Sequence, residues 1–397
     1  MSDRVERIVI VGAGQAGGRA ASELRGLGFA GSITILGDEA RLPYERPPLS
    51  KVVLAGDARA EDAPVNPAAF YEEQGIELRL DDPACAIDRA GSAVSLGSGE
   101  TIPYDRLILA TGVRPRALRV AGADMAGIFS LRTAADAERI GASLATARSV
   151  AIVGGGFVGL EVASLASARG LPVTVIERAG RCLSRVVPPL AAGRIAARHL
   201  ERNVRIRCDA EIAAITGDGR VEHIELADGE RVAADLVIVG IGSRPQDDLA
   251  LAAGLACADG VLVDARGRTS DPAIHAIGDV ARHGAGRHES WQNAEHGAAR
   301  AASSIMGLPL PADDAPWFWT DQQGWNVQLV GAFVDGDDVR EVSLGPESFV
   351  HLHVRDGRLA GAVLFNAGRE RRKLTRMIGQ AASFDQIIGQ QTGLGVA

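Results

Sequence analysis

The chain has few cysteines, and they form no pattern that carries chemistry. Four occur in 397 residues, and no two lie close together in the sequence. C-x-x-C pairs, zinc-ligand spacings and iron–sulfur spacings are all missing. A C-x-x-C disulfide reductase is therefore excluded, and we expect the cysteines to pack as small apolar side chains. They are Cys85, Cys182, Cys208 and Cys257.

Long apolar runs and an excess of positive charge are also missing. No uninterrupted apolar run approaches the ~20 residues of a membrane-spanning helix. The N-terminus enters a strand-like pattern without a signal-peptide core, so the expected location is the cytoplasm. Lys and Arg total 42 against 50 Asp and Glu, which gives a net charge of −8. This balance argues against nucleic acid as a general partner, and we expect no membrane partner.

Glycine is abundant, with 48 residues, and seven of them lie in two fingerprints of the form G-x-G-x-x-G. Each fingerprint follows an apolar strand and opens a helical stretch. The first glycine permits a tight turn, the second lets the backbone approach a pyrophosphate, and the third lets helix pack on strand. The helix N-terminus supplies free N–H groups to the phosphates. Two fingerprints predict two bound dinucleotides, with Gly12, Gly14 and Gly17 in the first and Gly154, Gly156 and Gly159 in the second.

The two fingerprints begin two modules of similar length, which predicts an internal repeat of a Rossmann-type unit with a β insertion. In the first module we expect strands at 8–11 and 32–36 around a helix at 15–27. The prolines of 42–51 exclude a helix there. In the second we expect strands at 150–153, 173–177 and 204–207, a helix at 189–201 and a hairpin through 218–219.

Composition changes again after a Pro-rich segment at 307–316, where three of the four tryptophans cluster. Strand patterns at 326–333, 339–344, 348–354 and 358–365 precede a basic helix from about 368. The predicted fold is α/β, with two Rossmann-like domains and a small α+β C-terminal domain. The expected boundaries are 1–112 with 243–315 for a discontinuous first domain, 113–242 for the second and 316–397 for the third.

Five further strings identify a resemblance. They are P-Y-E-R-P-P-L-S-K at 43–51, A-T-G at 110–112, I-G-D-V at 277–280, E-S-W-Q-N-A at 289–294 and W-F-W-T-D-Q at 317–322. Over almost its whole length the chain resembles the two-dinucleotide flavoprotein reductases of the glutathione-reductase structural class. Within that class it is most similar to the ferredoxin reductases of oxygenase systems. The R-P-P-L-S-K and E-S-W-Q-N-A strings are the specific ones.

The resemblance implies FAD and NADH as cofactors. The first fingerprint would bind the FAD pyrophosphate together with the Ala110, Thr111 and Gly112 motif. Gly278 and Asp279 would hold the ribityl chain or a phosphate. The flavin would be lined by Lys51, Arg132 and Trp319, and the second fingerprint would take the nicotinamide dinucleotide.

An acid at the end of the second strand of each module is expected to bind a ribose. Glu177 occupies this position in the second module, where a carboxylate favours NADH and repels a 2′-phosphate. The alternative is a solvated strand-end charge, and Arg178 leaves some use of NADPH open. In the first module the position is Gly37, so either Asp38 or Glu39 is expected to reach the FAD ribose.

Two further positions follow from the resemblance. Relatives place a Lys and a Glu together beside flavin and nicotinamide, which predicts a Lys51–Glu161 ion pair with Lys51 stabilising the charge of the reduced flavin. Glu289 would contact the nicotinamide carboxamide. The plainer alternatives are a surface lysine and a solvated loop acid, and for Trp319 an ordinary core aromatic.

A basic cluster near the C-terminus offers a docking surface in an otherwise acidic chain. Its alternative is a solvated helix face. Small [2Fe–2S] ferredoxins are typically acidic, and complementary charge speeds encounter. The cluster comprises Arg369, Arg371, Arg372, Lys373 and Arg376.

The predicted function is transfer of electrons from NADH through FAD to a [2Fe–2S] ferredoxin that serves a Rieske dioxygenase or a cytochrome P450. Monodehydroascorbate- and rubredoxin-type reductases are the closest enzymatic alternatives. A flavoprotein like apoptosis-inducing factor, acting mainly by interaction, is an alternative of another class. A monomer or weak homodimer is expected.

Overall fold

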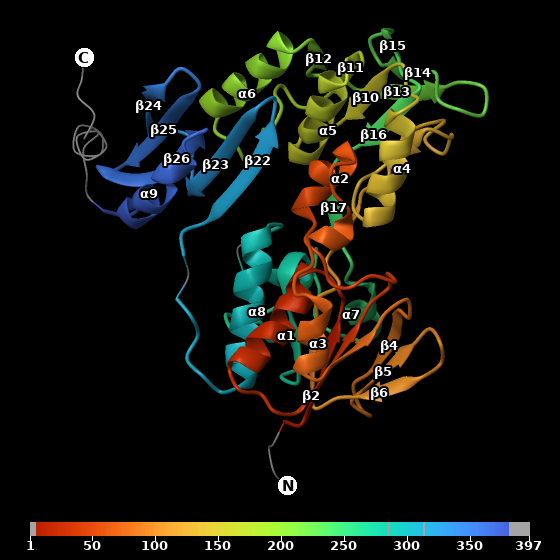
Figure 1. Ribbon diagram of the computed structural model, residues 1–397, viewed down its shortest axis with the longest axis vertical. Helices are drawn as coiled ribbons and strands as arrows, with labels where there is room; N and C mark the ends of the chain where they lie inside the picture. Colours follow the sequence, from red (N-terminus) through yellow and green to blue (C-terminus); the bar gives the residue numbers. More distant parts are fainter. Residues whose placement is uncertain (1–4, 285, 313, 381–397) are drawn as a thin grey trace. The chain divides into compact units, whose positions relative to one another are not determined.

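The computed structural model describes residues 5–284, 286–312 and 314–380, and the chain divides into two compact units (Figure 1). Unit 1 comprises the described parts of 1–116 and 243–313. Unit 2 comprises the described parts of 117–242 and 314–397. Unit 1 is therefore discontinuous in sequence, since the chain leaves it and returns.

Unit 1 is built on a five-stranded parallel sheet with β1 at its centre. The strand order is β19-β7-β1-β2-β3, and every neighbouring pair runs parallel. Both faces of such a sheet are covered, so its inner strands β1 and β7 are continuous apolar runs after their first residue, whereas the edge strand β3 alternates apolar and charged residues. The strands are β1 (Arg7–Val11), β2 (Ser32–Leu36), β3 (Ile76–Arg79), β7 (Arg106–Leu109) and β19 (Ile274–Ala276).

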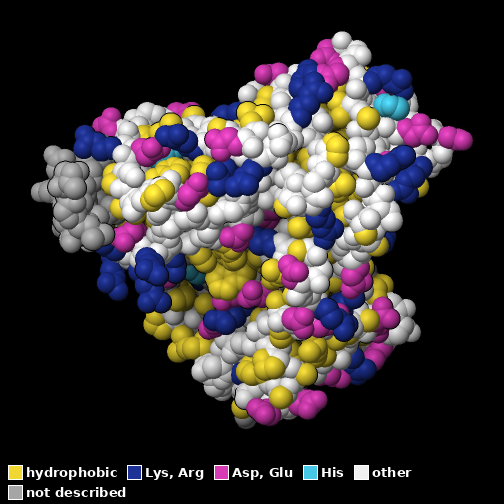
Figure 2. Space-filling view, turned by 45° about the horizontal axis from the view of Figure 1, so that its top comes forward, with side chains coloured by type: hydrophobic (Ala, Val, Ile, Leu, Met, Phe, Trp, Pro, Cys, Tyr) yellow, Lys and Arg dark blue, Asp and Glu magenta, His cyan; other side chains and the backbone are white. Residues whose placement is uncertain are grey.

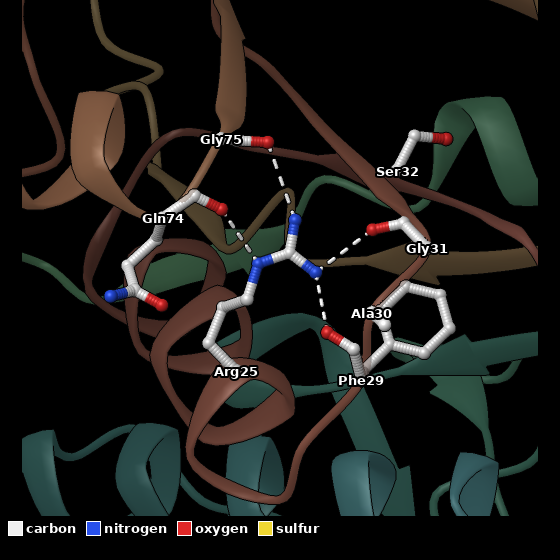
Figure 3. Close-up of a pocket in the computed structure, with 7 residues that line it drawn as sticks. All are labelled: Arg25, Phe29, Ala30, Gly31, Ser32, Gln74 and Gly75. Carbon is white, nitrogen blue, oxygen red and sulfur yellow. Dashed lines mark hydrogen bonds between the residues drawn. The ribbon is translucent and has the colours of Figure 1, made fainter.

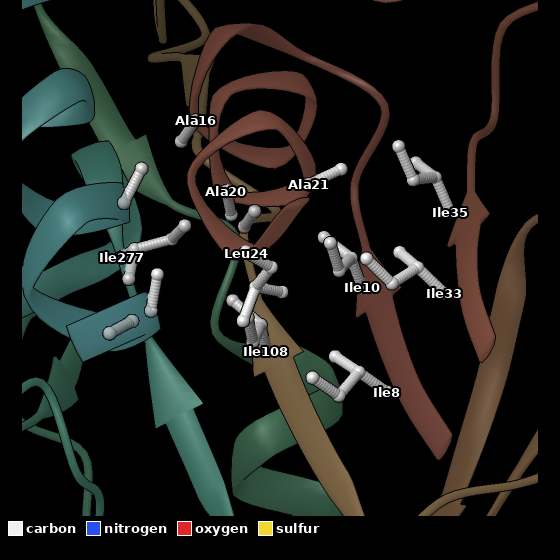
Figure 4. Packing of buried hydrophobic residues seen from close by; sticks show 14 of the residues in the cluster. Ile8, Ile10, Ala16, Ala20, Ala21, Leu24, Ile33, Ile35, Ile108 and Ile277 are labelled. Atoms are coloured by element: carbon white, nitrogen blue, oxygen red, sulfur yellow. The ribbon is translucent and has the colours of Figure 1, made fainter. Parts of the chain in front are cut away.

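Alternate residues of β1 enter two different cores. Ile8 and Ile10 pack against α1 (Gln15–Gly26) and α8 (Trp291–Ile305), as Figure 4 shows for the α1 side. Both helices turn mainly alanines toward this core, which lets them approach the sheet closely. Val9 and Val11 enter the core on the opposite face. Because α1 begins directly after β1, this packing holds the first fingerprint at the carboxyl end of the sheet.

Smaller elements complete unit 1. One layer is an antiparallel sheet of β4 (Ala84–Asp88), β5 (Ala93–Leu96) and β6 (Thr101–Pro103). Short ladders join β8 (Val113–Pro115) to β17 (Ser243–Pro245), and β18 (Val261–Leu262) to β20 (Ala281–His283) and β21 (Gly286–Arg287). The remaining helices are α2 (Val52–Ala55), α3 (Ala68–Glu73) and α7 (Asp248–Ala252), with 3₁₀ turns η1 (Pro47–Ser50), η2 (Ala60–Asp62) and η3 (Gly278–Val280).

Unit 2 repeats the parallel sheet, which confirms the predicted repeat. Its order is β12-β11-β10-β16-β9, so β10 takes the place of β1, β11 that of β2, β12 that of β3 and β16 that of β7. The strands are β9 (Ile128–Phe129), β10 (Val150–Val153), β11 (Val173–Ile176), β12 (Val204–Arg207) and β16 (Leu236–Val239). The helices are α4 (Ala134–Leu144), α5 (Phe157–Ala168) and α6 (Pro189–Glu201). An antiparallel sheet adds β13 (Ile212–Thr216), β14 (His223–Leu226) and β15 (Arg231–Ala233).

The end of the described chain forms a five-stranded antiparallel sheet in unit 2, with order β22-β23-β26-β25-β24. Val350, Leu352, Leu359 and Leu364 fill its core against α9. The outer strand β22 contacts α5 of the same unit. The elements are β22 (Trp317–Gln322), β23 (Trp325–Gly331), β24 (Asp338–Gly345), β25 (Ser348–Arg355), β26 (Arg358–Phe365), η4 (Gly368–Glu370) and α9 (Arg371–Met377).

Some elements of the structure are not among those expected from the sequence, including the helices α4 and α8. The Pro-rich stretch does contain a helical turn, η1, because proline is tolerated at the first positions of a helix. The strand β22 was not expected, although its register with β23 is regular over six residue pairs. Among the described residues, no helix combines the length and apolarity that crossing a membrane requires.

Candidate dinucleotide-binding sites

In the first fingerprint the three glycines meet three different requirements. Gly12 has φ +118°, and a Cβ there would lie 2.3 Å from the Ala110 carbonyl oxygen. A Cβ on Gly17 would lie 1.9 Å from the Gly12 carbonyl oxygen, so only glycine lets α1 pack this closely. At Gly14 the nearest side-chain atom to such a Cβ is 3.8 Å away. The space in front of Gly14 is therefore open to a ligand.

The second fingerprint has the same geometry. Gly154 has φ +104°, with a Cβ position 2.4 Å from the Gly240 carbonyl oxygen. A Cβ on Gly159 would lie 2.3 Å from the Gly154 carbonyl oxygen. At Gly156 the nearest atom to a Cβ is 3.9 Å away, so the middle glycine again faces open space.

Both helices that follow the fingerprints present unsatisfied N–H groups. Gly14 is the N-cap of α1 and Gly156 that of α5, and neither provides a capping side chain. No acidic residue stands in the first turn of either helix. An anionic group would satisfy these donors and interact favourably with the helix dipole. Both cradles fit the pyrophosphate of a dinucleotide.

The A-T-G motif lies at the carboxyl end of β7, directly beside the first fingerprint. The Ala110 N–H donates to the Val11 carbonyl oxygen at 2.8 Å. The Thr111 hydroxyl donates to the Gln246 carbonyl oxygen at 2.6 Å, and the Gln246 amide donates back to the Thr111 carbonyl oxygen at 2.7 Å. Gly112 follows with φ +69°. The two hydrogen bonds with Gln246 join the motif to the second sequence segment of unit 1, which begins at residue 243.

The G-D motif is brought to the same end of the unit 1 sheet. Gly278 has φ +66°, and a Cβ there would lie 2.9 Å from the Ala16 Cβ in the first turn of α1. The Asn293 amide donates to the Gly278 carbonyl oxygen at 3.2 Å, and Arg287 donates to that of Asp279 at 3.1 Å. Asp279 is therefore held close to the first fingerprint.

The strand-end position differs between the modules. Gly37 and Glu177 are equivalent, since each N–H donates at 2.8 Å to the third strand, Gly37 to Arg79 and Glu177 to Arg207. The Glu177 carboxylate accepts the N–H groups of Gly155 and Ala179, each at 2.7 Å. It is thereby fixed beside the second fingerprint.

In the first module the neighbouring acids differ in environment. Asp38 is exposed. Glu39 accepts a hydrogen bond from the Tyr44 hydroxyl at 2.8 Å and lies 3.5 Å from the Arg46 guanidinium. Of the two expected ribose ligands, Glu39 is the one with a fixed carboxylate.

Other predicted site residues are distributed over both units. In unit 1 the Lys51 ammonium donates to the Pro47 carbonyl oxygen at 3.2 Å, and Glu289 accepts from Arg287 at 2.6 Å and from the Ser243 hydroxyl. In unit 2 the Arg132 N–H donates to Asp136 at 3.1 Å. The predicted pairing of Lys51 with Glu161 joins different units, and it stays a prediction.

The aromatic string of β22 forms a stack within unit 2. The rings of Trp317 and Trp319 lie 4.8 Å apart between centroids at an interplanar angle of 16°. The Arg371 guanidinium lies 4.5 Å from the Trp317 ring centroid, a cation–π distance. The basic cluster is therefore not one uniform solvated face: Arg369, Arg372 and Arg376 are exposed, whereas Arg371 and Lys373 are half-buried.

Two cysteines that are distant in the sequence come together in unit 2. The Cys208 thiol lies within hydrogen-bonding reach of Cys182, and burial raises the pKa of the Cys182 thiol to about 12. Burial also raises the pKa of Cys208. Both thiols are protonated at neutral pH, which agrees with the expected role as small apolar side chains. No group of metal-ligating side chains occurs among the described residues.

An open hollow of about 440 Å³ in unit 1 lies at the other end of α1 from the fingerprint (Figure 3). Arg25 fills its centre and donates to the carbonyl oxygens of Phe29, Gly31, Gln74 and Gly75 at 2.6–3.3 Å. These bonds tie two turns to the end of α1. The hollow is a structural clamp, away from the carboxyl end of the sheet where ligands of such folds bind.

Two family models match the chain. The one described as pyridine nucleotide-disulphide oxidoreductase matches residues 6–298, and the one described as reductase C-terminal matches 317–390.

Named relatives agree with these matches. The chain is 39% identical over 386 residues to the biphenyl dioxygenase system ferredoxin–NAD(+) reductase component of Paraburkholderia xenovorans, covering 96% of this chain and 94% of the relative. It is 42% identical over 337 residues to a rubredoxin–NAD(+) reductase of Pseudomonas putida, covering 83% and 88%.

A solved structure has the same fold over nearly the whole chain. It is the ferredoxin reductase for the CYP199A2 system from Rhodopseudomonas palustris, with a TM-score of 0.91 and 35% identity, covering 97% of this chain and 99% of that one. The chain thus belongs to the pyridine nucleotide-disulphide oxidoreductase family, within the group whose members are named ferredoxin–NAD(+) reductases.

Proposed function

We propose that this chain is an FAD-containing reductase that takes electrons from NADH and passes them to a [2Fe–2S] ferredoxin of an oxygenase system. The observation that carries the proposal is the matching geometry of the two glycine cradles, each with an open middle glycine before an uncapped helix. Two dinucleotide sites in one chain are what transfer between two cofactors requires.

The first cradle is assigned to FAD and the second to NAD(H). Gly12, Gly14 and Gly17 would meet the FAD pyrophosphate with Ala110 to Gly112 beside them, and Asp279 would contact the ribityl chain or a phosphate. FAD supplies the conversion between two-electron and one-electron chemistry when bound. The task of the protein is to bind, orient and shield it.

Side chains are assigned to the reactive end of the cofactors by resemblance to the family. Lys51 would pair with Glu161, place its positive charge near the flavin ring and stabilise the negative charge that reduction adds there. Arg132 and Trp319 would line the flavin, and Glu289 would accept a hydrogen bond from the nicotinamide carboxamide. The proposed domain limits are 1–112 with 243–315, 113–242 and 316–397.

The preferred nucleotide is proposed to be NADH. Support comes from Glu177, whose carboxylate is held beside the second fingerprint by two backbone N–H groups. Each of its oxygens retains a further acceptor position for a ribose hydroxyl, and its charge disfavours a 2′-phosphate.

Two acceptors have specific support. The relative named for a biphenyl dioxygenase system favours a ferredoxin, and the relative named as a rubredoxin reductase favours rubredoxin as the second candidate. A ferredoxin would dock on the basic cluster at Arg369, Arg371, Arg372, Lys373 and Arg376. The expected monomer or weak homodimer and the cytoplasmic location accompany this proposal.

The test is NADH-driven reduction of cytochrome c by the purified flavin-loaded protein, with no carrier, with a [2Fe–2S] ferredoxin, or with a rubredoxin. A large increase with ferredoxin supports the proposal. A larger increase with rubredoxin would move the assignment to the second candidate. Bleaching of the flavin by NADH without acceleration by either carrier would favour a protein that acts mainly by interaction.

A further inference from the structure

A buried chain of polar side chains in unit 2 begins at Glu161, inside the first turns of α5. Glu161 is 5% exposed, and its Oε1 atom accepts a hydrogen bond from the Thr320 hydroxyl at 2.5 Å. Thr320 lies in β22 and is completely buried. A hydroxyl that donates to a buried carboxylate makes a charge-assisted bond, which is short and strong.

The next bonds in the chain determine the direction in which each proton points. The Gln322 amide nitrogen donates to the Thr320 oxygen at 3.1 Å, which leaves the Thr320 proton for Glu161. The Gln322 amide oxygen therefore faces the His199 Nε2 atom, at 2.8 Å. An amide oxygen accepts only, so the proton of the neutral imidazole must be on Nε2.

The second ring nitrogen of His199, Nδ1, must then be an acceptor, and its neighbour is a donor. The Gln323 amide nitrogen lies 3.1 Å from His199 Nδ1, and it also donates to the Ser167 hydroxyl at 3.0 Å. The Gln323 backbone N–H donates to the Ser164 hydroxyl at 2.7 Å. Because Ser164 and Ser167 belong to α5, this series of hydrogen bonds starts and ends on the helix that carries Glu161.

Among the described residues, His199 differs from the other buried histidines in how its ring nitrogens are hydrogen-bonded. His275 and His351 each have one ring nitrogen without a hydrogen-bond partner, and His353 has two. Both nitrogens of His199 are paired. Burial lowers the pKa of His199, which keeps the ring neutral, the state that the bonding pattern requires.

We propose that Thr320, Gln322 and His199 are positioning residues that fix the orientation of the Glu161 carboxylate at the second dinucleotide site. The Thr320 hydroxyl anchors one carboxylate oxygen of Glu161 and thereby fixes the plane in which the other oxygen lies. Gln322 and His199 hold the Thr320 hydroxyl in its donating orientation. The inference rests on the proposed role of Glu161 in the reaction with NADH.

The protein offers a matched set of variants for testing the role of Thr320. Thr320→Val keeps the volume but removes the donor to Glu161 and the acceptor for Gln322, whereas Thr320→Ser keeps the hydroxyl. Thr34 supplies the control, because its hydroxyl donates to the Glu77 carboxylate at 3.1 Å on strands β2 and β3. Thr34→Val therefore removes a Thr–carboxylate bond in unit 1 and leaves the bonds within unit 2 intact.

The experiment is a double-mutant cycle on the flavin-loaded protein, with the rate of flavin reduction by NADH and the affinity for NAD⁺ measured separately. We expect Thr320→Val to slow reduction by about tenfold, Thr320→Ser and Thr34→Val to change it by less than about twofold, and Thr320→Val to add nothing in a Glu161→Gln background. An equal loss in both backgrounds would overturn the inference, because Thr320 would then act independently of Glu161.

A second readout does not depend on activity. In protein with ¹⁵N-labelled histidine, the His199 ring, assigned with the variant His199→Gln, should show a protonated Nε2 and an unprotonated Nδ1. A protonated Nδ1 would overturn the inferred series of hydrogen bonds. If Glu161→Gln alone leaves reduction by NADH unchanged, the proposed role of Glu161 fails and the inference fails with it. If reduction responds as expected but no carrier is accelerated, only the acceptor assignment fails.

Discussion

At the scale of single residues, the two modules differ by a reciprocal exchange of side-chain volume. In the first module Ala13 stands between the fingerprint glycines, and a Cβ on Gly37 would lie only 2.6 Å from the Ala13 Cβ. In the second module Gly155 replaces the alanine, and Glu177 occupies the strand end with its carboxylate on the Gly155 N–H. An acid therefore fits at the strand end where the second position of the fingerprint is the additional glycine Gly155, and not where it is Ala13.

This arrangement predicts the effect of Glu177→Gln. The amide keeps one acceptor oxygen but turns an NH₂ group toward a backbone N–H, and it removes the charge that, in the proposed site, would repel a 2′-phosphate. We expect the KM for NADH to rise about tenfold with little change in kcat, since uniform binding is lost. The ratio of kcat/KM for NADPH to that for NADH should rise.

Steady-state kinetics with both nucleotides test this expectation. Glu222→Gln, which changes an exposed acid of the same unit, is the control. An unchanged KM for NADH in Glu177→Gln would place the nucleotide ribose elsewhere.

A second residue-scale prediction concerns pH. Burial, reinforced by Arg268 and Arg106 and opposed by Asp264, lowers the pKa of His275 to about 4. An unfolded histidine has a pKa near ~6.5, so between these values the unfolded chain binds more protons than the folded one. The contribution of His275 to the free energy of unfolding is therefore complete above about pH 6.5 and is lost as the pH falls toward 4.

The variant His275→Gln should remove this contribution. Over that range its free energy of unfolding should depend less steeply on pH, by up to about 1.4 kcal/mol per pH unit. Chemical denaturation at several pH values measures the slope, and the exposed His288→Gln is the control. If the free energy of unfolding depends equally steeply on pH in the wild type and in His275→Gln, then His275 binds its proton in the folded protein as readily as in the unfolded chain, and the expectation is wrong.

At the scale of elements, the sequence predicted what is local. The strand–turn–helix units are encoded by contiguous residues, so β1, α1, β10 and α5 were found from their apolar runs and glycines. The repeat could also be predicted, because two copies of one pattern imply the same kind of unit. The structure confirms the repeat, since the two five-stranded sheets have equivalent strand orders.

Contacts between distant segments could not be predicted in the same way. The strand β22 mixes aromatic and polar residues, and nothing local shows that Thr320 and Gln322 face α5 and α6. Glu161 was identified only by resemblance, and its partner Thr320 not at all. The adjacency of Cys182 and Cys208 likewise depends on how the loops after β11 and β12 lie together.

The fingerprints allow an element-scale prediction, because their glycines differ in what a methyl group would meet. Gly14 and Gly156 have φ values of −99° and −82°, which alanine adopts, and their Cβ positions face open space. Gly14→Ala should fold but lose bound flavin. Gly156→Ala should keep flavin and raise the KM for NADH about tenfold, or ~1.4 kcal/mol. Gly17→Ala should fail to fold, because its Cβ would overlap the Gly12 carbonyl oxygen.

Circular dichroism, flavin absorbance and NADH kinetics distinguish these outcomes. Gly26→Ala in α1 and Gly193→Ala in α6 are controls, since a Cβ at either position meets nothing within 4 Å. Loss of flavin from Gly156→Ala with retention in Gly14→Ala would reverse the assignment of the two cradles.

At the scale of the whole molecule, charge is the property that bears on the partner. The chain carries a net charge of −8, and Figure 2 shows Lys and Arg side chains interspersed with Asp and Glu over the visible face. Against this background the five cations within residues 369–376 are a local exception, since Glu370 is the sole acid among them. A local positive surface on an acidic protein steers an acidic partner to one orientation while the remaining surface repels it.

The last prediction separates docking by charge from the internal chemistry. The triple change of Arg369, Arg372 and Arg376 to Gln should lower kcat/KM for an acidic ferredoxin roughly tenfold at low ionic strength, because steering is lost. Arg371 is retained, since it stacks on Trp317. Reduction of the flavin by NADH should not change.

The difference in kcat/KM between this variant and the wild type should shrink with added salt, since the Debye length falls from ~10 Å at 0.1 M to ~3 Å at 1 M. Changing the exposed Arg148, Arg202 and Arg220 to Gln alters the net charge equally and is the control. Equal losses in both triple variants would show that net charge, and not this cluster, governs encounter with the ferredoxin.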